Sequence, residues 1–158
     1  FSQEMSELLS IPVTACDAPE EVTQSADIVV VATNSREPVL RGDWLLPGQH
    51  VNAIGSNNIK RVEVDKEVIA RANFIATDSV EQAKIECGDL AAVVSDGGLS
   101  WDHVYELADV VAKKVVPRSS EEDITLFESQ GLAIEDVAVA RYVYEAGQKQ
   151  GIGTKLDI

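Results

Sequence analysis

Two hydroxyls and an amide stand at the end of a strongly apolar run of the chain. Thr33, Asn34 and Ser35 close the run ADIVVVA, and Pro38 restrains the backbone shortly afterwards. Side chains of this kind can hydrogen-bond a ribose or a pyrophosphate where the backbone comes close. Thr, Asn and Ser are also ordinary turn residues, so composition alone favours a capped turn over a binding loop.

A second polar loop, GSNNIKR, follows the apolar residues 51–54. Gly55 permits close backbone approach, and Asn57 can donate and accept hydrogen bonds. Lys60 or Arg61 could neutralise a phosphate. A solvated loop with charges near a helix start is equally consistent with these residues, so the sequence leaves both interpretations open.

The third loop, ESQGLAIED, lies between an apolar stretch and a long helical pattern. Ser129 and Gly131 precede a helix N-terminus, where free N–H groups and the helix dipole favour an anion or a carbonyl oxygen. Capping by Ser129, with Glu135 and Asp136 stabilising the first turns, explains the same residues. One such junction is a weak signal, whereas three polar loops after strands of one sheet are a stronger one.

No recognised catalytic set is present in the sequence. Asp102 and His103 are adjacent, but there is no G-x-S-x-G nucleophile elbow, and Cys87 has no evident partner. Cys16 and Cys87 are far apart and in no metal-ligand spacing, and the only other histidine is His50, so no metal site is expected. The G-x-G-x-x-G pattern of dinucleotide-binding turns is also absent.

The acidic composition excludes several classes of partner. The 158 residues carry a formal net charge of -14, with 13 Lys plus Arg against 27 Asp plus Glu. Such a surface repels phosphate backbones and anionic lipids, so no nucleic-acid or membrane partner is expected. No apolar run approaches the ~18 residues that cross a membrane. Two widely separated cysteines indicate reduced thiols and a cytoplasmic protein.

Strands and helices alternate along the sequence. Short apolar stretches typical of strands cover residues 11–16, 26–33, 51–54, 74–76 and 124–129. Helical patterns cover residues 2–9, 65–72, 79–86, 101–114 and 131–150, and a further helix begins after residue 17. Asp17 is expected to cap that helix, and Gly151 to end the last one.

This alternation predicts an α/β fold with a mostly parallel sheet in three layers, because strands apolar on both faces need helices on each side. Ligands of such sheets bind at the carboxyl ends of the strands. The loops 33–38, 55–61, 77–82 and 128–133 follow strands and are therefore expected to meet at one edge.

Two stretches carry a resemblance to a known family: ADIVVVATNSREPVLRGDWLLPGQHVNAIGSN and ITLFESQGLAIEDVAVARYVYE. They resemble the ornithine cyclodeaminase/mu-crystallin family, to which archaeal alanine dehydrogenase and ketimine reductases also belong. The resemblance covers nearly the whole chain. It implies a Rossmann-like domain that binds NAD or NADP and, in the complete protein, a substrate domain that forms a homodimer.

The resemblance also implies that the chain begins in mid-fold. The family's glycine-rich turn and ribose-binding acid would lie upstream of Phe1, which leaves residues 1–151 as a truncated cofactor domain and residues 152–158 as a C-terminal tail. In a sheet of order 3-2-1-4-5-6 the stretch 26–33 would then lie at an open edge, where we expect a second copy to pair. The chain alone is expected to bind NAD(P) weakly or not at all.

The family's cofactor contacts fall on two of the polar loops. The resemblance places Thr33, with Asn34 and Ser35, against the dinucleotide at the end of a strand. It brings the segment Ala53–Ile54–Gly55 close to the nicotinamide.

Further contacts fall on the second and third loops. Arg61, or Lys60 if the loop length varies, matches a basic residue that contacts the cofactor. Ser129 matches a serine near the nicotinamide, and Gln130 matches a residue whose backbone lines the substrate pocket.

Asn57 departs from the family's pattern. Cyclodeaminases and alanine dehydrogenase place an aspartate here, and an amide cannot take up a proton at neutral pH. Asn57 can therefore orient a substrate but cannot act as a general base. The resemblance implies an oxidoreductase that acts on an amino acid or a cyclic imine by hydride transfer. The alternatives are a non-catalytic mu-crystallin-like protein that binds NADPH and a small ligand, and a true ornithine cyclodeaminase, which is an ammonia-lyase.

Overall fold

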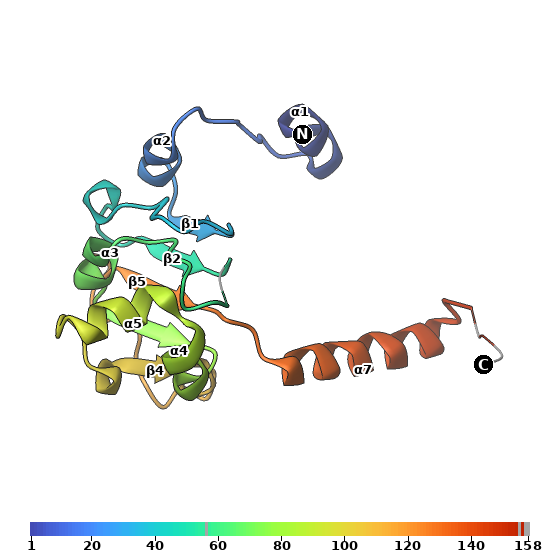
Figure 1. Ribbon diagram of the computed structural model, residues 1–158. Helices are drawn as coiled ribbons and strands as arrows, with labels where there is room; N and C mark the ends of the chain where they lie inside the picture. The colour runs from blue at the N-terminus through green and yellow to red at the C-terminus, as the bar shows by residue number, and fades with distance from the viewer. Residues whose placement is uncertain (56, 155, 157–158) are drawn as a thin grey trace.

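Five parallel strands form one sheet, with helices packed against it (Figure 1). The computed structural model describes residues 1–55, 57–154 and 156, so the predicted tail falls partly outside the described residues. The strands are β1 (Ile28–Val31), β2 (His50–Ala53), β3 (Phe74–Thr77), β4 (Val104–Glu106) and β5 (Thr125–Glu128). The helices are α1 (Ser2–Leu9), α2 (Pro19–Gln24), α3 (Lys66–Arg71), α4 (Val80–Glu86), α5 (Gly88–Ser95), α6 (Leu107–Val111) and α7 (Ala133–Gln150), with 3-10 turns η1 (Gly42–Trp44) and η2 (Trp101–His103). The predicted α/β class with a parallel sheet is confirmed.

The order of strands in the sheet is β1-β2-β5-β3-β4. The last strand of the chain therefore lies in the middle, whereas the expected order would place β3 directly beside β2. The start of β5 is fixed from both sides: Thr125 N–H donates to the Gln49 carbonyl at 3.1 Å, and Ile124 N–H donates to Asn73 Oδ1 at 2.9 Å. These contacts join residues that are distant in the chain, so no local pattern predicts them.

One face of the sheet carries the core. In register across the strands, a buried row is formed by Val29, Val51, Leu126, Ile75 and Val104. Helices α3, α4 and α5 lie over this face and add apolar side chains to the same cluster (Figure 1). On the opposite face α6 contacts β3 and β4, which gives the third layer, although Ile28 and Val30 of β1 stay exposed on that face.

Strand β1 lies at the edge of the sheet and pairs with β2 alone. Ile28 and Val30 are 61% and 57% exposed, whereas Val29 and Val31 are buried. The expected open edge is thus confirmed, but the strand is covered on only one face. The expected pairing of this edge with a second copy stays a prediction.

Three local predictions are wrong. Residues 11–16 form no strand, because Val13 N–H bonds to Ser6 Oγ of α1 at 2.8 Å and not to the sheet. Residues 101–114 are not one helix but η2, β4 and α6 in succession, because residues 104–106 pair with β3. Asp17 does not cap α2, whose N-cap is Ala18 without a side-chain hydrogen bond.

Other helix signals are confirmed. Pro19 begins α2, and the Asp65 side chain caps α3 by accepting from Val68 N–H. Gly151 ends α7 in the left-handed conformation with φ 65°. That conformation is costly for residues with a Cβ, which explains why a glycine stands there.

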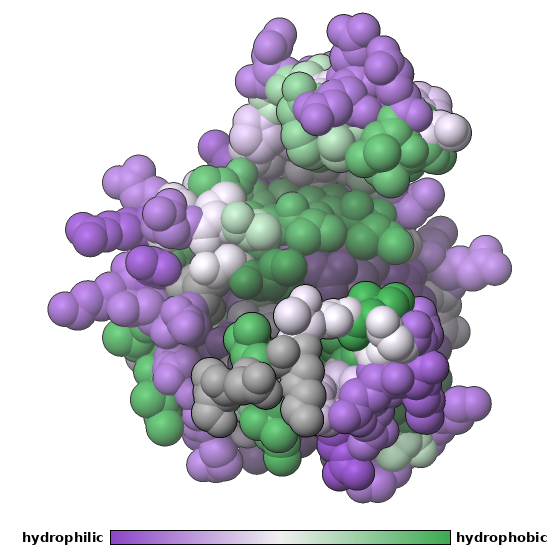
Figure 2. All heavy atoms as spheres, turned by 90° about the vertical axis from the view of Figure 1, so that its right-hand side faces the viewer, coloured by the Kyte–Doolittle hydropathy of each residue, from purple (hydrophilic) through white to green (hydrophobic). Residues whose placement is uncertain are grey.

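The first and last helices extend away from the sheet (Figure 1). Neither α1 nor α7 contains a buried residue, and α7 exposes apolar side chains, among them Ile134, Val137 and Tyr144. Viewed onto the carboxyl ends of the strands, apolar atoms gather in a hollow between α1 and the end of α7 (Figure 2). Among the described residues, no helix combines the length and apolar character needed to cross a membrane.

Candidate functional site

The carboxyl ends of β1, β2 and β5 lie side by side. Beyond the strands, Ile54 N–H donates to the Val31 carbonyl at 2.8 Å, and Ser129 N–H donates to the Ala53 carbonyl at 3.0 Å. The loops that begin at Thr33, Gly55 and Ser129 therefore start next to one another, in the order of the strands. The structure brings together three of the polar loops that the sequence singles out.

Gly55 allows the first two of these loops to touch. A Cβ on this residue would lie 2.2 Å from both the backbone N and O of Thr33 and 2.4 Å from Glu63 Oε1. Real Cβ atoms essentially never come closer than 3.0 Å to another atom. Only glycine fits where these two strand ends meet.

Two buried carboxylates, those of Glu63 and Asp78, accept hydrogen bonds from the loops and were not predicted from the sequence. Glu63 is 0% exposed, and it accepts hydrogen bonds from Thr33 and from Gly55 N–H. Asp78 is 8% exposed, and it accepts hydrogen bonds from the loop after β5, beginning with Ser129 Oγ–H. The position of Asp78 directly after a predicted strand is the one sequence signal for its role. The sequence around Glu63 carries no such signal, because an acid just before a helix is typical of a solvated charge.

Some of the predicted contact residues offer no free side chain at the carboxyl ends of the strands. Ala53 is buried, so only its backbone takes part in the edge. Ser35 Oγ donates to the Glu37 carbonyl at 2.6 Å and accepts from Glu37 N–H, which closes a turn. Asn34 is exposed, and Ile54 is 45% exposed, so these two side chains are open to a ligand.

A small cavity of about 280 Å³ lies between the loops after β1 and β2. Arg36, Asn58, Lys60 and Arg61 line it. Within the described part of the chain, none of its three cations lies within 4.0 Å of a carboxylate oxygen. In a chain of net charge -14 this is a local concentration of positive charge. Asn57, in the same loop, is exposed.

Gln130 is buried beside the third loop. Its Oε1 accepts from Thr77 Oγ–H at 3.0 Å, and its backbone N–H donates to Asp78 Oδ2 at 2.8 Å. Its Nε2 has no hydrogen-bond partner among the described residues. A buried amide with an unused donor suits a polar ligand atom, in line with the predicted place of this residue at a substrate pocket.

Cys87, Asp89 and Glu128 form an acidic cluster beneath the edge. Their ligand atoms lie within 4.8 Å of one another, a proximity that their spacing in the sequence does not reveal. Burial, with the nearby Asp89 charge, raises the pKa of Glu128 well above its usual value, and burial beside Glu128 raises the pKa of the Cys87 thiol. Burial also raises the pKa of Asp89 to about 6. Within the cluster, Cys87 Sγ donates to Glu128 Oε2 at 3.6 Å.

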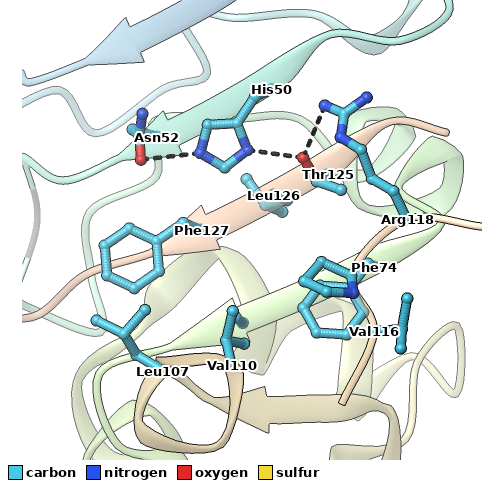
Figure 3. Close-up of a pocket in the computed structure, with 12 residues that line it drawn as sticks. His50, Asn52, Phe74, Leu107, Val110, Val116, Arg118, Thr125, Leu126 and Phe127 are labelled. Atoms are coloured by element: carbon cyan, nitrogen blue, oxygen red, sulfur yellow. Dashed lines mark hydrogen bonds between the residues drawn. The ribbon is translucent and has the colours of Figure 1, made fainter. Parts of the chain in front are cut away.

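A cavity of about 500 Å³ lies on the open face of the sheet (Figure 3). His50 Nδ1 lies 2.7 Å from Thr125 Oγ1, which also accepts from Arg118 at 3.2 Å, and the remaining lining is largely apolar. Arg118 also donates to the carbonyls of Gly48, Gln49 and Asp123, which fixes it as a structural group. None of the predicted cofactor or substrate residues lines this cavity.

The chain is similar to curated proteins and to solved structures. Delta(1)-pyrroline-2-carboxylate reductase of Bacillus cereus is 35% identical over 99% of the chain. The Thermococcus litoralis reductase of the same name, solved with NADH and L-proline, superimposes with a TM-score of 0.91 at 36% identity over 98% of the chain. An archaeal alanine dehydrogenase, solved as a dimer with bound NAD, gives a TM-score of 0.84 at 36% identity over 98% of the chain.

The chain spans about half the length of these relatives, which is 48% of each of the three. The structural similarity is therefore to the part of each relative that holds the parallel sheet. A model of the ornithine cyclodeaminase/mu-crystallin family matches residues 1–151, and the chain belongs to that family.

Proposed function

We propose that this edge of the sheet binds the nicotinamide half of NAD(H) or NADP(H). The full-length protein then transfers a hydride to or from the nitrogen-bearing carbon of an amino acid or cyclic imine. One observation carries the proposal: Thr33, Gly55 and Ser129 lie side by side at the carboxyl ends of adjacent parallel strands. Ligands of open α/β sheets bind at this edge.

The described groups suit such a cofactor. Thr33 and Ser129 bring hydroxyls to the edge, and Gly55 allows close approach of the backbone. Arg36, Lys60 and Arg61 concentrate positive charge nearby, as an anionic ligand requires. The nicotinamide supplies or accepts the hydride, while the protein positions it against the substrate. Because the chain has no G-x-G-x-x-G turn, the proposal concerns the nicotinamide side of the cofactor.

Asn57 favours imine reduction or amino-acid oxidation over cyclodeamination. An amide can orient a substrate nitrogen by hydrogen bonding, but it cannot relay a proton as a carboxylate can. The relatives named pyrroline-carboxylate reductase and alanine dehydrogenase support an imine or amino-acid substrate. The dimeric alanine dehydrogenase supports a homodimer, and two free cysteines support a cytoplasmic location.

The test is an assay of the full-length protein with NADH or NADPH. We expect cofactor oxidation with Δ1-pyrroline-2-carboxylate, or with pyruvate plus ammonia, and little ammonia release from ornithine. Absence of cofactor oxidation with every imine and every pair of oxo-acid and amine would overturn the enzymatic proposal.

A second candidate is a protein that binds a nicotinamide cofactor and a small ligand without turnover. The amide at position 57, where cyclodeaminases of the family carry an acid, favours it. Calorimetric titration separates the two: tight NADPH binding without any turnover supports the binding protein, and steady turnover excludes it.

A further inference from the structure

Glu63 joins the ends of β1 and β2 through one side chain. Its Oε1 accepts from Thr33 N–H at 2.5 Å and from Thr33 Oγ–H at 2.7 Å, and its Oε2 accepts from Gly55 N–H at 2.6 Å. Its own N–H donates to Asp89 Oδ1 at 2.9 Å, which fixes the residue from behind. Both carboxylate oxygens are therefore occupied by groups of the two loops.

Asp78 acts in the same way on the loop after β5, but through a single oxygen. Its Oδ2 accepts from Ser129 Oγ–H at 2.8 Å, from Gln130 N–H at 2.8 Å and from Gly131 N–H at 2.7 Å. The loop is thereby bound to the end of β3.

These bonds decide the hydrogen-bonding character of the edge. The hydroxyls of Thr33 and Ser129 both donate to a carboxylate oxygen, so each points its single proton inward. The backbone N–H groups of Thr33, Gly55, Gln130 and Gly131 are used as well, and Ser129 N–H bonds to Ala53. The two hydroxyls are left with lone pairs for a ligand, although Thr33 Oγ1 already accepts from Ser35 N–H at 3.2 Å.

We propose that Glu63 and Asp78 are positioning residues that fix Thr33 and Ser129 as hydrogen-bond acceptors. At these two positions the site then favours ligand groups that donate, such as a carboxamide NH₂, a ribose hydroxyl or an imine N–H, over carboxylate and phosphate oxygens. The inference rests on the proposed cofactor site and adds which chemical groups that site recognises.

The two carboxylates make different predictions on conversion to amides. Glu63→Gln leaves one acceptor where two oxygens are used, so one N–H of the loops must face another donor. Asp78→Asn leaves one oxygen, which can still accept all three bonds. A role that depended on negative charge alone would be lost equally in both variants.

The test measures binding of NAD⁺ and of nicotinic acid adenine dinucleotide, in which a carboxylate replaces the carboxamide, to the full-length protein. The wild type should bind NAD⁺ about tenfold or more tightly, because in the other dinucleotide a hydrogen bond from the carboxamide is replaced by repulsion between the carboxylate and the hydroxyl lone pairs. Glu63→Gln should weaken NAD⁺ binding by about tenfold, and Asp78→Asn by less than about twofold. Asp78→Ala frees the Ser129 proton to turn outward, so it should reduce the preference at least severalfold, although Glu63 still holds Thr33.

Glu106→Gln is the matched control, because it changes a carboxylate at the end of β4 that, among the described residues, accepts from Val80 N–H alone, at 2.8 Å. It should leave both affinities unchanged. Equal binding of the two dinucleotides by the wild type, or equal losses in Glu63→Gln and Asp78→Asn, would overturn the inference while leaving the cofactor site standing. Failure of the wild type to bind NAD⁺ at all would overturn the cofactor site.

A second measurement tests the anchoring without any ligand. Amide hydrogen exchange at Thr33 and Gly55 should be slow in the wild type and faster in Glu63→Gln, while Ile54, whose N–H bonds to Val31, reports on the intact sheet. Unchanged exchange at Thr33 and Gly55 in that variant would contradict the role of Glu63.

Discussion

Substitution of Gly55 by alanine tests whether the close contact of two strand ends holds this edge together. The new Cβ would lie 2.2 Å from the Thr33 backbone, and relief to an ordinary contact needs roughly 1 Å of additional separation. The hydrogen bonds of Gly55 N–H to Glu63 and of Ile54 N–H to Val31 are 2.6 and 2.8 Å long. A shift of that size takes both beyond hydrogen-bonding range.

The expected cost follows from these two bonds. The bond to the buried Glu63 carboxylate contributes roughly 1.5–3 kcal/mol and the backbone bond about 1 kcal/mol, so with residual crowding Gly55→Ala should lose about 3–5 kcal/mol. That is a large share of the ~5–15 kcal/mol by which a domain is stable. Equilibrium unfolding in urea, followed by circular dichroism, measures the loss.

Two other glycines provide controls. A Cβ on Gly98 would meet the Val93 Cγ1 methyl at 3.0 Å and the Val93 carbonyl oxygen at an ordinary 3.5 Å, so Gly98→Ala should cost less than about 1 kcal/mol. A Cβ on Gly42 would meet the backbone of α3 at 2.4 Å, so Gly42→Ala should lose stability but leave nucleotide binding by the folded fraction intact. If Gly55→Ala unfolds within about 1 kcal/mol of the wild type, the reasoning about this contact is refuted.

Two further predictions concern the buried cluster. Folding raises the pKa of Asp89 to about 6, from about 3.9 in an unfolded chain, because burial disfavours its charge. The folded state therefore binds this proton more tightly, and the associated stability is present below pH ~4 and lost as the pH rises through about 6. Asp89→Asn keeps the acceptor for the N–H groups of Glu63 and Val64 but removes the titrating group. Relative to the wild type, the free energy of unfolding of this variant should therefore rise by up to about 3 kcal/mol between pH 4 and pH 7. Parallel pH profiles of the two proteins would contradict this. For the thiols, a maleimide should label Cys16 in the native protein, whereas Cys87, which is buried with a raised pKa, should react only after denaturation; native labelling of a Cys16→Ser variant would count against it.

The sequence predicts the element types where local signals are strong. The consecutive β-branched residues of β1, the Asp65 cap of α3 and the Gly151 terminus of α7 all act through neighbours within a few positions, so pattern alone suffices. The same holds for the polar loops, because strand ends of a parallel sheet meet at one edge wherever the strands lie. The prediction of one helix over residues 101–114 is wrong, because residues 104–106 pair with β3 as strand β4 in spite of their helical periodicity.

The sequence by itself determined the α/β class, the family and the polar loops that follow the strands. Only the tertiary structure decided that β5 enters the middle of the sheet and that Glu63 and Asp78 lie beneath the edge. The reason is chain separation: Glu63 is 30 residues from Thr33, and Asp78 is 51 residues from Ser129. From the sequence alone, each carboxylate is expected to be a surface charge. The fold instead buries both beside N–H and O–H donors, and these hydrogen bonds determine which ligand groups the hydroxyls can bind.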